Sequence, residues 1–231
     1  MNINYIKAFE DNYIWTIEKD DKIIVVDPGD SVPVLNYLKN KKLVAILLTH
    51  KHMDHVGGVP KLKNKYDAKV YGPVETKEYN DVTLNEGDEF EILDESFKVI
   101  LTSGHTKGHI SYLMGDNLFC GDALFLAGCG RVFTKDYKKS YEGLLKLKKL
   151  DDDTKVYPAH EYSLANLEFA KSVISNYDLE KEYERVKKLR EENKITLPST
   201  IGKEKKINPF LLARNLEEFI IFRNKKDNFK G

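Results

Sequence analysis

The most chemically informative segment of the sequence is residues 49–55, which read Thr-His-Lys-His-Met-Asp-His. The segment places His50, His52, Asp54 and His55 directly after the apolar run LVAILL, which is typical of a buried strand. Loops at strand ends present functional groups on a rigid support, and core packing does not require four such groups on one loop. Imidazole and carboxylate suit zinc, iron or manganese, and the lack of cysteine argues against a closed structural zinc site.

Three later segments have the same layout, because each is a strand-like run that ends in a turn carrying one more candidate ligand. These segments are FKVILTSGHTKGH with His105, NLFCGDALF with Asp122, and VYPAHEY with His160. Side chains just past the ends of several strands can meet at one edge of a sheet. We therefore expect these residues to join the 49–55 cluster.

The number of candidate ligands exceeds what one metal ion needs. Four protein ligands would complete a tetrahedral site and leave no position for water, whereas seven suit two divalent ions that share a carboxylate. The predicted ligands are His50, His52 and His105 for the first ion, Asp54, His55 and His160 for the second, and Asp122 as the bridge. A hydroxide shared by both ions would supply the missing ligand and act as nucleophile, with Asp54 and Asp122 as the catalytic carboxylates.

The elements that must position these residues change in character along the chain. Up to His160 the sequence is rich in short β-branched runs with helical patterns between them, which predicts an α/β fold with helices covering the sheets. Helical patterns occur at 32–40, 59–66, 140–150, 164–177, 179–193 and 215–223. We predict a metal-binding catalytic domain over 1–162, a helical domain over 163–231, and a turn segment at 197–210. Gly57 and Gly58 are expected to give the backbone freedom to turn sharply into a helix.

Composition narrows the class of protein. The 231 residues carry equal numbers of acidic and basic side chains, so the basic face of a nucleic-acid binder is not expected. No apolar run approaches the roughly 20 residues that span a bilayer. Two cysteines, Cys120 and Cys129, are too few for a disulfide framework. Together with a start that lacks a signal-peptide pattern, they favour a cytoplasmic protein, and a monomer is the default expectation.

The motifs together resemble a known family. THKHMDH followed by His105, Asp122 and His160 resembles the metallo-β-lactamase superfamily. The ordered segments DNYIW, VDPGD, THKHMDHVGG, TSGHTKGHISY, FCGDALFLAGCGRVF, PAHEYSLANLEFA, LPSTIGKEK, NPFLL and FRNKKD resemble glyoxalase II (hydroxyacylglutathione hydrolase) over nearly the whole chain. The resemblance implies a four-layered αββα sandwich with a small C-terminal helical domain. It also implies two divalent ions, zinc first with iron or manganese as alternatives, and hydrolysis of S-D-lactoylglutathione in methylglyoxal detoxification.

The resemblance also implies residues that bind the glutathione moiety. Arg131 and Phe133 in GCGRVF match the family's glutathione-contacting loop, and Tyr162 matches a tyrosine that contacts glutathione. Arg223 and Lys226 match a basic pair that grips the glycine carboxylate. The chain departs from the family's pattern in having Ala123 where threonine is commoner, and extra apolar residues after NPF, but neither departure touches a predicted ligand.

The remaining polar residues of the motifs are predicted to support the site. His109 is interpreted as a supporting residue and Asp27 as a partner that orients a ligand, with a plain Asp-Pro-Gly turn as the alternative for Asp27. No histidine lies beside Cys129 in the sequence, so a thiol nucleophile is not expected. Two alternatives remain: a mononuclear-iron glutathione persulfide dioxygenase of the same superfamily, and an inactive metal- or glutathione-binding module.

Overall fold

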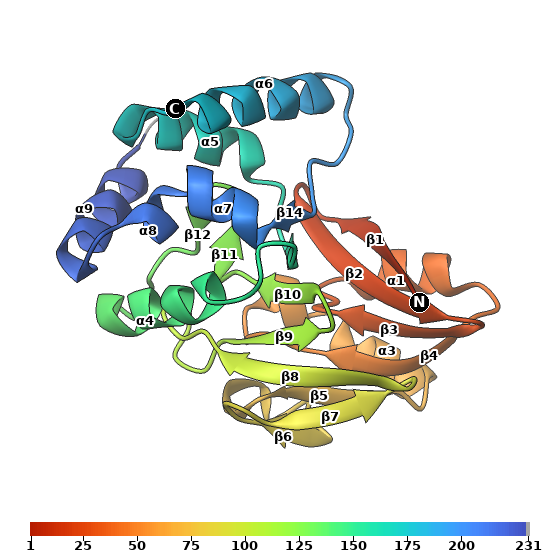
Figure 1. Cartoon of the computed structure of the whole chain (residues 1–231). Coiled ribbons are helices and arrows are strands. Elements are labelled where there is room, and N and C mark those ends of the chain that lie inside the picture. The colour runs from red at the N-terminus through yellow and green to blue at the C-terminus, as the bar shows by residue number, and fades with distance from the viewer. Residues whose placement is uncertain (230–231) are drawn as a thin grey trace.

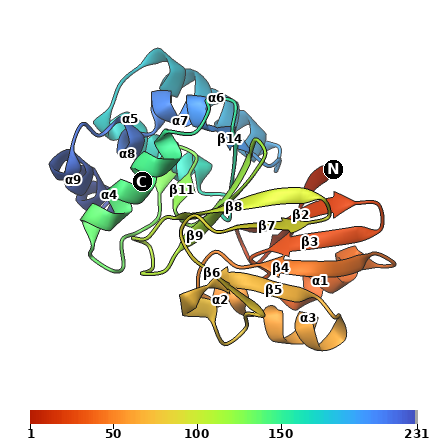
Figure 2. The same ribbon diagram turned by 60° about the horizontal axis from the view of Figure 1, so that its bottom comes forward.

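The structure, a computed structural model that describes residues 1–229, has four layers in the order helices, sheet, sheet, helices (Figures 1 and 2). Within these residues two six-stranded sheets face each other, as the predicted α/β class requires. The first sheet has the order β1 (Asn2–Ala8), β2 (Asn12–Lys19), β3 (Lys22–Val26), β4 (Lys42–Leu47), β5 (Lys69–Pro73), β6 (Val82–Leu84). The second has the order β14 (Ser199–Thr200), β13 (Lys155–Pro158), β10 (Asn117–Gly121), β9 (Ile110–Met114), β8 (Glu95–Leu101), β7 (Glu89–Ile92).

Helices cover the outer face of each sheet. The helices and short elements outside the sheets are α1 (Ser31–Leu38), α2 (Met53–Val56), α3 (Val59–Lys65), η1 (Val74–Thr76), β11 (Leu124–Phe125), β12 (Gly128–Cys129), α4 (Tyr137–Lys148), α5 (Ser163–Val173), α6 (Tyr177–Glu191), α7 (Ile201–Ile207), α8 (Pro209–Leu212) and α9 (Leu216–Asp227). Figure 2 shows α1 and α3 against the first sheet, and α4 with the C-terminal helices on the opposite side of the molecule. Among the described residues no helix is both long and apolar enough to cross a membrane.

Three apolar clusters correspond to the three interfaces between the layers. The central cluster joins residues such as Trp15 and Val26 of the first sheet to Phe97 and Tyr112 of the second. A second cluster packs the first sheet against α1 and α3, and a third packs the second sheet against α4 and the C-terminal helices. Burial of alternate strand faces therefore fixes the sandwich and the orientation of each strand.

The predicted turn segment at 197–210 is wrong, because most of it is helical. Thr200 caps α7 by accepting a hydrogen bond from the amide of Lys203 at 3.2 Å, and Asn208 caps α8 by accepting one from the amide of Phe210 at 3.0 Å. Helices of four to seven residues are too short to show clear periodicity, so the caps were the available sequence signal. The longer C-terminal helices were predicted correctly.

The expectation that Gly57 and Gly58 give the backbone freedom to turn sharply is wrong. Gly57 and Gly58 have ordinary helical φ angles of −58° and −81°, which any residue can adopt. A Cβ at Gly58 would instead lie 2.4 Å from the carbonyl oxygen of Pro28. Glycine is therefore required at position 58 because the loop at Pro28, which follows β3, packs directly against this backbone, where the Gly58 amide donates to the Pro28 carbonyl at 2.9 Å.

Candidate metal centre and glutathione cleft

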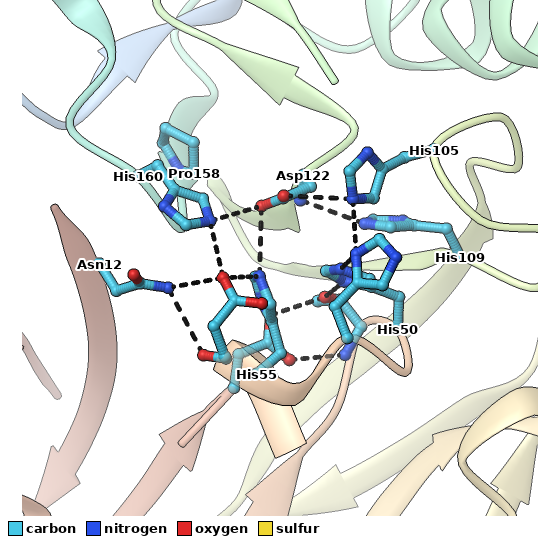
Figure 3. A network of polar contacts seen from close by, with 12 residues as sticks. Asn12, His50, His55, His105, His109, Asp122, Pro158 and His160 are labelled. Atoms are coloured by element: carbon cyan, nitrogen blue, oxygen red, sulfur yellow. Dashed lines mark hydrogen bonds and ion pairs between the residues drawn. The ribbon is translucent and has the colours of Figure 1, made fainter. Parts of the chain in front are cut away.

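Strand direction explains why the predicted ligands meet. In the second sheet β8, β10 and β13 run in the same direction, so His105, Asp122 and His160 emerge from their carboxyl ends at one edge. The cluster after β4 lies across from that edge, and the amide of Ile110 donates to the carbonyl of Thr49 at 2.9 Å. The structure thus brings all seven predicted ligands together, and Figure 3 labels five of them, His50, His55, His105, Asp122 and His160.

The seven side chains form two groups of ligand atoms. In the first group His52 Nδ1 lies 3.0 Å from His50 Nε2 and 2.9 Å from His105 Nε2. Asp122 Oδ2 completes this group, 3.3 Å from His105 Nε2. Ligand atoms around a tetrahedral zinc with bonds of about 2.0–2.1 Å are roughly 3.3 Å apart, so the spacing suits one ion.

The second group uses the other oxygen of the same aspartate. Asp122 Oδ1 lies 3.5 Å from His55 Nε2 and 3.3 Å from His160 Nε2. Asp54 Oδ2 lies 3.4 Å from each of these two nitrogens. Asp122 therefore presents one oxygen to each group, which is the arrangement of a bridging carboxylate.

Two buried atoms provide an independent test of whether a metal fits. Among the described residues, His55 Nε2 and Asp122 Oδ1 are the buried side-chain polar atoms that have no hydrogen-bond partner. Such atoms are costly in a folded protein unless a ligand satisfies them. Both belong to the second group of ligand atoms, so a divalent ion placed there would satisfy both.

Hydrogen bonds on the far side of each ring fix which nitrogen faces the centre. His50 Nδ1 lies 3.1 Å from Thr49 Oγ1, whose hydroxyl donates to Asp27 Oδ2 at 2.6 Å and so accepts from the histidine. His55 Nδ1 lies 3.1 Å from the same carboxylate oxygen. With Nδ1 protonated, Nε2 of both rings keeps its lone pair for a metal. These contacts confirm that Asp27 orients the ring of His55 directly and that of His50 through Thr49, the two rings that are predicted ligands.

Two supporting residues at the start of β2 were missed by the sequence analysis. Asp11 Oδ1 lies 2.8 Å from His160 Nδ1, and Asn12 Nδ2 donates to Asp54 Oδ2 at 3.1 Å. Both belong to the DNYIW segment, so the family motif contained the signal although it offered no ligand. The turn between β1 and β2 therefore forms one wall of the second ligand group.

His109 supports the bridge rather than joining it. Its Nε2 accepts a hydrogen bond from the amide of Asp122 at 3.1 Å, so Nδ1 carries the proton and donates to Thr102 Oγ1 at 2.9 Å. Both nitrogens are thus engaged, and the interpretation of His109 as a supporting residue is confirmed. His105 Nδ1 similarly donates to the carbonyl of Arg131 at 3.0 Å, which ties a ligand to the predicted glutathione loop.

Electrostatics divide the histidines into two kinds. Burial lowers the pKa of His105 to about 4 and that of His50 well below its usual value, so both are neutral. Burial also acts to lower the pKa of His160, but the carboxylates of Asp122 and Asp54 outweigh it and raise that pKa to about 10. The second group therefore demands positive charge beside its carboxylates. A divalent ion can supply that charge in place of protons, so metal binding should release protons.

A cleft of about 310 Å³ lies beside the candidate metal centre and is lined by four of the five predicted glutathione contacts. These four residues are Arg131, Tyr162, Arg223 and Lys226. The ring of Tyr162 stacks on that of His160, with centroids 4.7 Å apart, so the cleft reaches the second ligand group. Burial, followed by the charge of Arg223, lowers the pKa of Lys226 to about 8.

The fifth predicted contact, Phe133, lies outside the lining of this cleft. It is 58% exposed and meets the rings of His52 and His105 edge-on at 5.6 and 5.3 Å. Phe133 therefore covers the first ligand group. A larger cleft of about 490 Å³ is lined by charged residues of α6 and α7 and by none of the predicted ligands, so we assign it no part in the chemistry.

Comparisons with known proteins agree with the motifs. A family model described as the metallo-beta-lactamase superfamily matches residues 9–160, and one described as the hydroxyacylglutathione hydrolase C-terminus matches residues 161–229. A hydroxyacylglutathione hydrolase of Actinobacillus pleuropneumoniae serotype 5b (strain L20) is 47% identical, covering 99% of this chain and 100% of that protein. The chain belongs to the hydroxyacylglutathione hydrolase family. A hydroxyacylglutathione hydrolase of Salmonella gallinarum (strain 287/91 / NCTC 13346) is 41% identical with the same two coverages.

Solved structures confirm the metallo-β-lactamase fold of this hydroxyacylglutathione hydrolase family member. ETHE1 from Myxococcus xanthus has a TM-score of 0.77 at 26% identity, covering 100% of this chain and 92% of that chain. TTHA1623, solved in a di-iron-bound form, has a TM-score of 0.64 at 24% identity, covering 91% of this chain and 100% of that chain. The predicted αββα sandwich and the recognition of a thioester hydrolase family are thus both confirmed.

Proposed function

We propose that the chain hydrolyses S-D-lactoylglutathione to glutathione and D-lactate, the second step of methylglyoxal detoxification. The observation that carries the proposal is the division of Asp122 between two groups of ligand atoms directly beside a cationic cleft. Its seven ligands would be His50, His52, His105, Asp54, His55, His160 and Asp122, holding two divalent ions, with zinc as the first expectation and iron or manganese as alternatives. When bound, such ions supply hydroxide at neutral pH and a Lewis acid for the thioester carbonyl.

The carboxylates of Asp54 and Asp122 supply the negative charge of the site. Both stay ionised although they are buried, because hydrogen bonds and charge from His55 and His160 keep the pKa of each carboxylate well below its usual range. The neutral imidazoles of His50 and His105, each oriented by a hydrogen bond at Nδ1, belong to the first group of ligand atoms. The thiolate is a good leaving group, so little acid catalysis is required from the protein.

The cleft would hold the glutathione moiety. Glutathione carries two carboxylates, and the cleft is lined by Arg131, Arg223 and Lys226, of which the two arginines also pair with Asp227 at 3.4 and 2.9 Å. Tyr162 forms the wall between these cations and His160. Loss of these residues should weaken substrate binding more than turnover. We further propose 163–231 as the C-terminal helical domain that supplies Arg223 and Lys226, with 1–162 as the catalytic domain.

The alternative of a mononuclear-iron persulfide dioxygenase is less well supported. The second ligand group is complete, and the relatives at 41–47% identity carry the hydrolase name. An inactive binding module is expected to have lost ligands, whereas all seven predicted ligands are present in this chain. The distinction is experimental, because the metal count and the reaction differ.

Thioester hydrolysis and metal per chain should be measured on the same preparation. We expect turnover of S-D-lactoylglutathione that is lost on chelation, with close to two metals per chain. The S-D-lactoyl thioester of N-acetylcysteamine is the matched control, because it keeps the acyl group and lacks the peptide. Equal kcat/KM for the two substrates would refute glutathione recognition. One iron per chain with oxygen uptake on glutathione persulfide would refute hydrolysis.

A further inference from the structure

One segment lies between the proposed metal centre and the glutathione cleft, and its strands β11 and β12 pair only with each other among the described residues. This segment, residues 124–131, is here termed the cleft loop; it contains β11 and β12 and ends at Arg131. Phe125 and Cys129 line the cleft, and the Arg131 carbonyl accepts the hydrogen bond from His105. The position of the loop therefore affects both substrate binding and one metal ligand.

The backbone of the cleft loop is shut off from water. Residues 124–130 are all buried, and Ala127 adopts a left-handed φ of 52°, which is unfavourable for a residue with a Cβ. Buried amides and carbonyls that find no partner are costly, so the turn needs hydrogen-bonding groups from elsewhere in the fold.

Polar side chains of the C-terminal helices supply those groups. The contacts are Asn166 Nδ2 to the Leu126 carbonyl at 3.2 Å, Asn208 Nδ2 to the carbonyls of Phe125 at 3.2 Å and Gly128 at 2.9 Å, the Ala127 amide to Glu204 Oε2 at 2.8 Å, and an Arg223 guanidinium nitrogen to the Cys129 carbonyl at 2.8 Å. Glu204 and Asn208 are fully buried and bonded to each other at 3.0 Å. Side chains from α5, α7, α9 and the N-cap of α8 therefore hold the backbone of the cleft loop in place.

We infer that Glu204 and Asn208 are positioning residues for glutathione binding, because they hold the cleft loop that carries Arg131. The inference rests on the proposed function. Neither side chain lines the cleft, so both act through the loop and not on the substrate. The segment 197–210 thereby has a role beyond linking the long C-terminal helices.

The substitution Asn208→Asp tests this role without changing the size of the side chain. Aspartate keeps an oxygen to cap Phe210 but loses the donor that holds two loop carbonyls. We expect KM for S-D-lactoylglutathione to rise at least about tenfold, because the hydrogen bonds to two loop carbonyls are lost, while kcat stays within about twofold and metal content is unchanged. We also expect faster amide hydrogen exchange in residues 124–130 without any substrate.

Asn215→Asp is the matched control. Asn215 is exposed and caps α9 by accepting from the amide of Glu218 at 2.9 Å, and it makes no hydrogen bond to the cleft loop. Glu204→Ala should raise KM because it removes the acceptor of the Ala127 amide, and Glu204→Gln, which keeps an acceptor oxygen, should recover part of that loss. If Asn208→Asp does not fold, Asn208→Ser replaces it, since a hydroxyl caps the helix but is too short to reach both carbonyls.

The outcomes separate this inference from the proposed function. An unchanged KM and unchanged exchange in Asn208→Asp would overturn the inference, as would an equal rise of KM in Asn215→Asp. A third outcome is faster amide exchange confined to the cleft loop of Asn208→Asp, together with a wild-type protein that does not hydrolyse the thioester. That outcome would support the role of Asn208 in holding the loop and would overturn the proposed substrate instead. The inference would also be overturned if Asn208→Asp lost metal and if adding metal back restored the wild-type KM.

Discussion

The contact between Asp11 and His160 allows a quantitative test of how the protein supports its second group of ligand atoms. In Asp11→Asn the amide oxygen still accepts from His160 Nδ1, so the ring keeps its orientation but loses the charge behind it. Loss of a supporting carboxylate typically costs about 10–100-fold in metal affinity. The side chain of Asp11 is 38% exposed, and water screens its charge, so we expect the lower end, about tenfold.

Asp27 provides the comparison within the same group. Its side chain is 3% exposed and accepts from the amide and the hydroxyl of Thr49 as well as from His55. Asp27→Asn should therefore weaken metal binding toward about 100-fold, because the charge is unscreened and an amide cannot accept all these bonds. Asp27→Asn should therefore lose more metal affinity than Asp11→Asn if burial of the carboxylate determines the size of the effect.

The assay is competition for zinc with a chromophoric chelator, followed by metal counting after dialysis. Glu10→Gln removes an exposed carboxylate from the same turn and is the matched control. The reasoning is refuted if Asp11→Asn binds both equivalents as tightly as the wild type, or if Glu10→Gln weakens binding to the same extent. A larger effect for Asp11→Asn than for Asp27→Asn would refute the argument from burial.

Three further predictions follow from single side chains. Asp122→Ala should release metal from both ligand groups and lower kcat by on the order of 10³; metal counting and turnover test this, and full occupancy would contradict the bridge. Lys226, with its pKa near 8, should bind the substrate carboxylate less well as pH rises through about 8, so KM should rise there in the wild type but stay flat in Lys226→Arg, which remains charged; parallel profiles would contradict this role. Burial raises the pKa of Glu204 from 4.5 to about 7. The contribution of this group to the free energy of unfolding is therefore fully present below pH 4.5 and is lost as pH rises through about 7. The loss is about 3 kcal/mol, and Glu204→Gln should remove it in urea unfolding at pH 5 and pH 8, whereas an unchanged pH dependence would contradict the shift.

The sequence by itself predicted the candidate metal centre because the predicted ligands are grouped by local spacing. Four of the seven lie within residues 50–55, in the loop and short helix α2 that follow β4, and the other three each follow their own strand. The types and number of these donors predict two divalent ions without reference to any tertiary contact. Amphipathic patterns also predicted the long helices, because burial of one face repeats every few residues whatever the partner is.

Tertiary structure alone decided which atoms support the ligands. Asp11 and His160 are 149 residues apart, and Asp27 serves His50 and His55 only because β3 and β4 are neighbours. The same holds for Glu204 and Asn208, whose buried side chains meet the cleft loop about 80 residues earlier in the chain. Each such partner is an ordinary polar residue with no pattern of its own, and its role comes from the position to which the packed sheets and helices bring it.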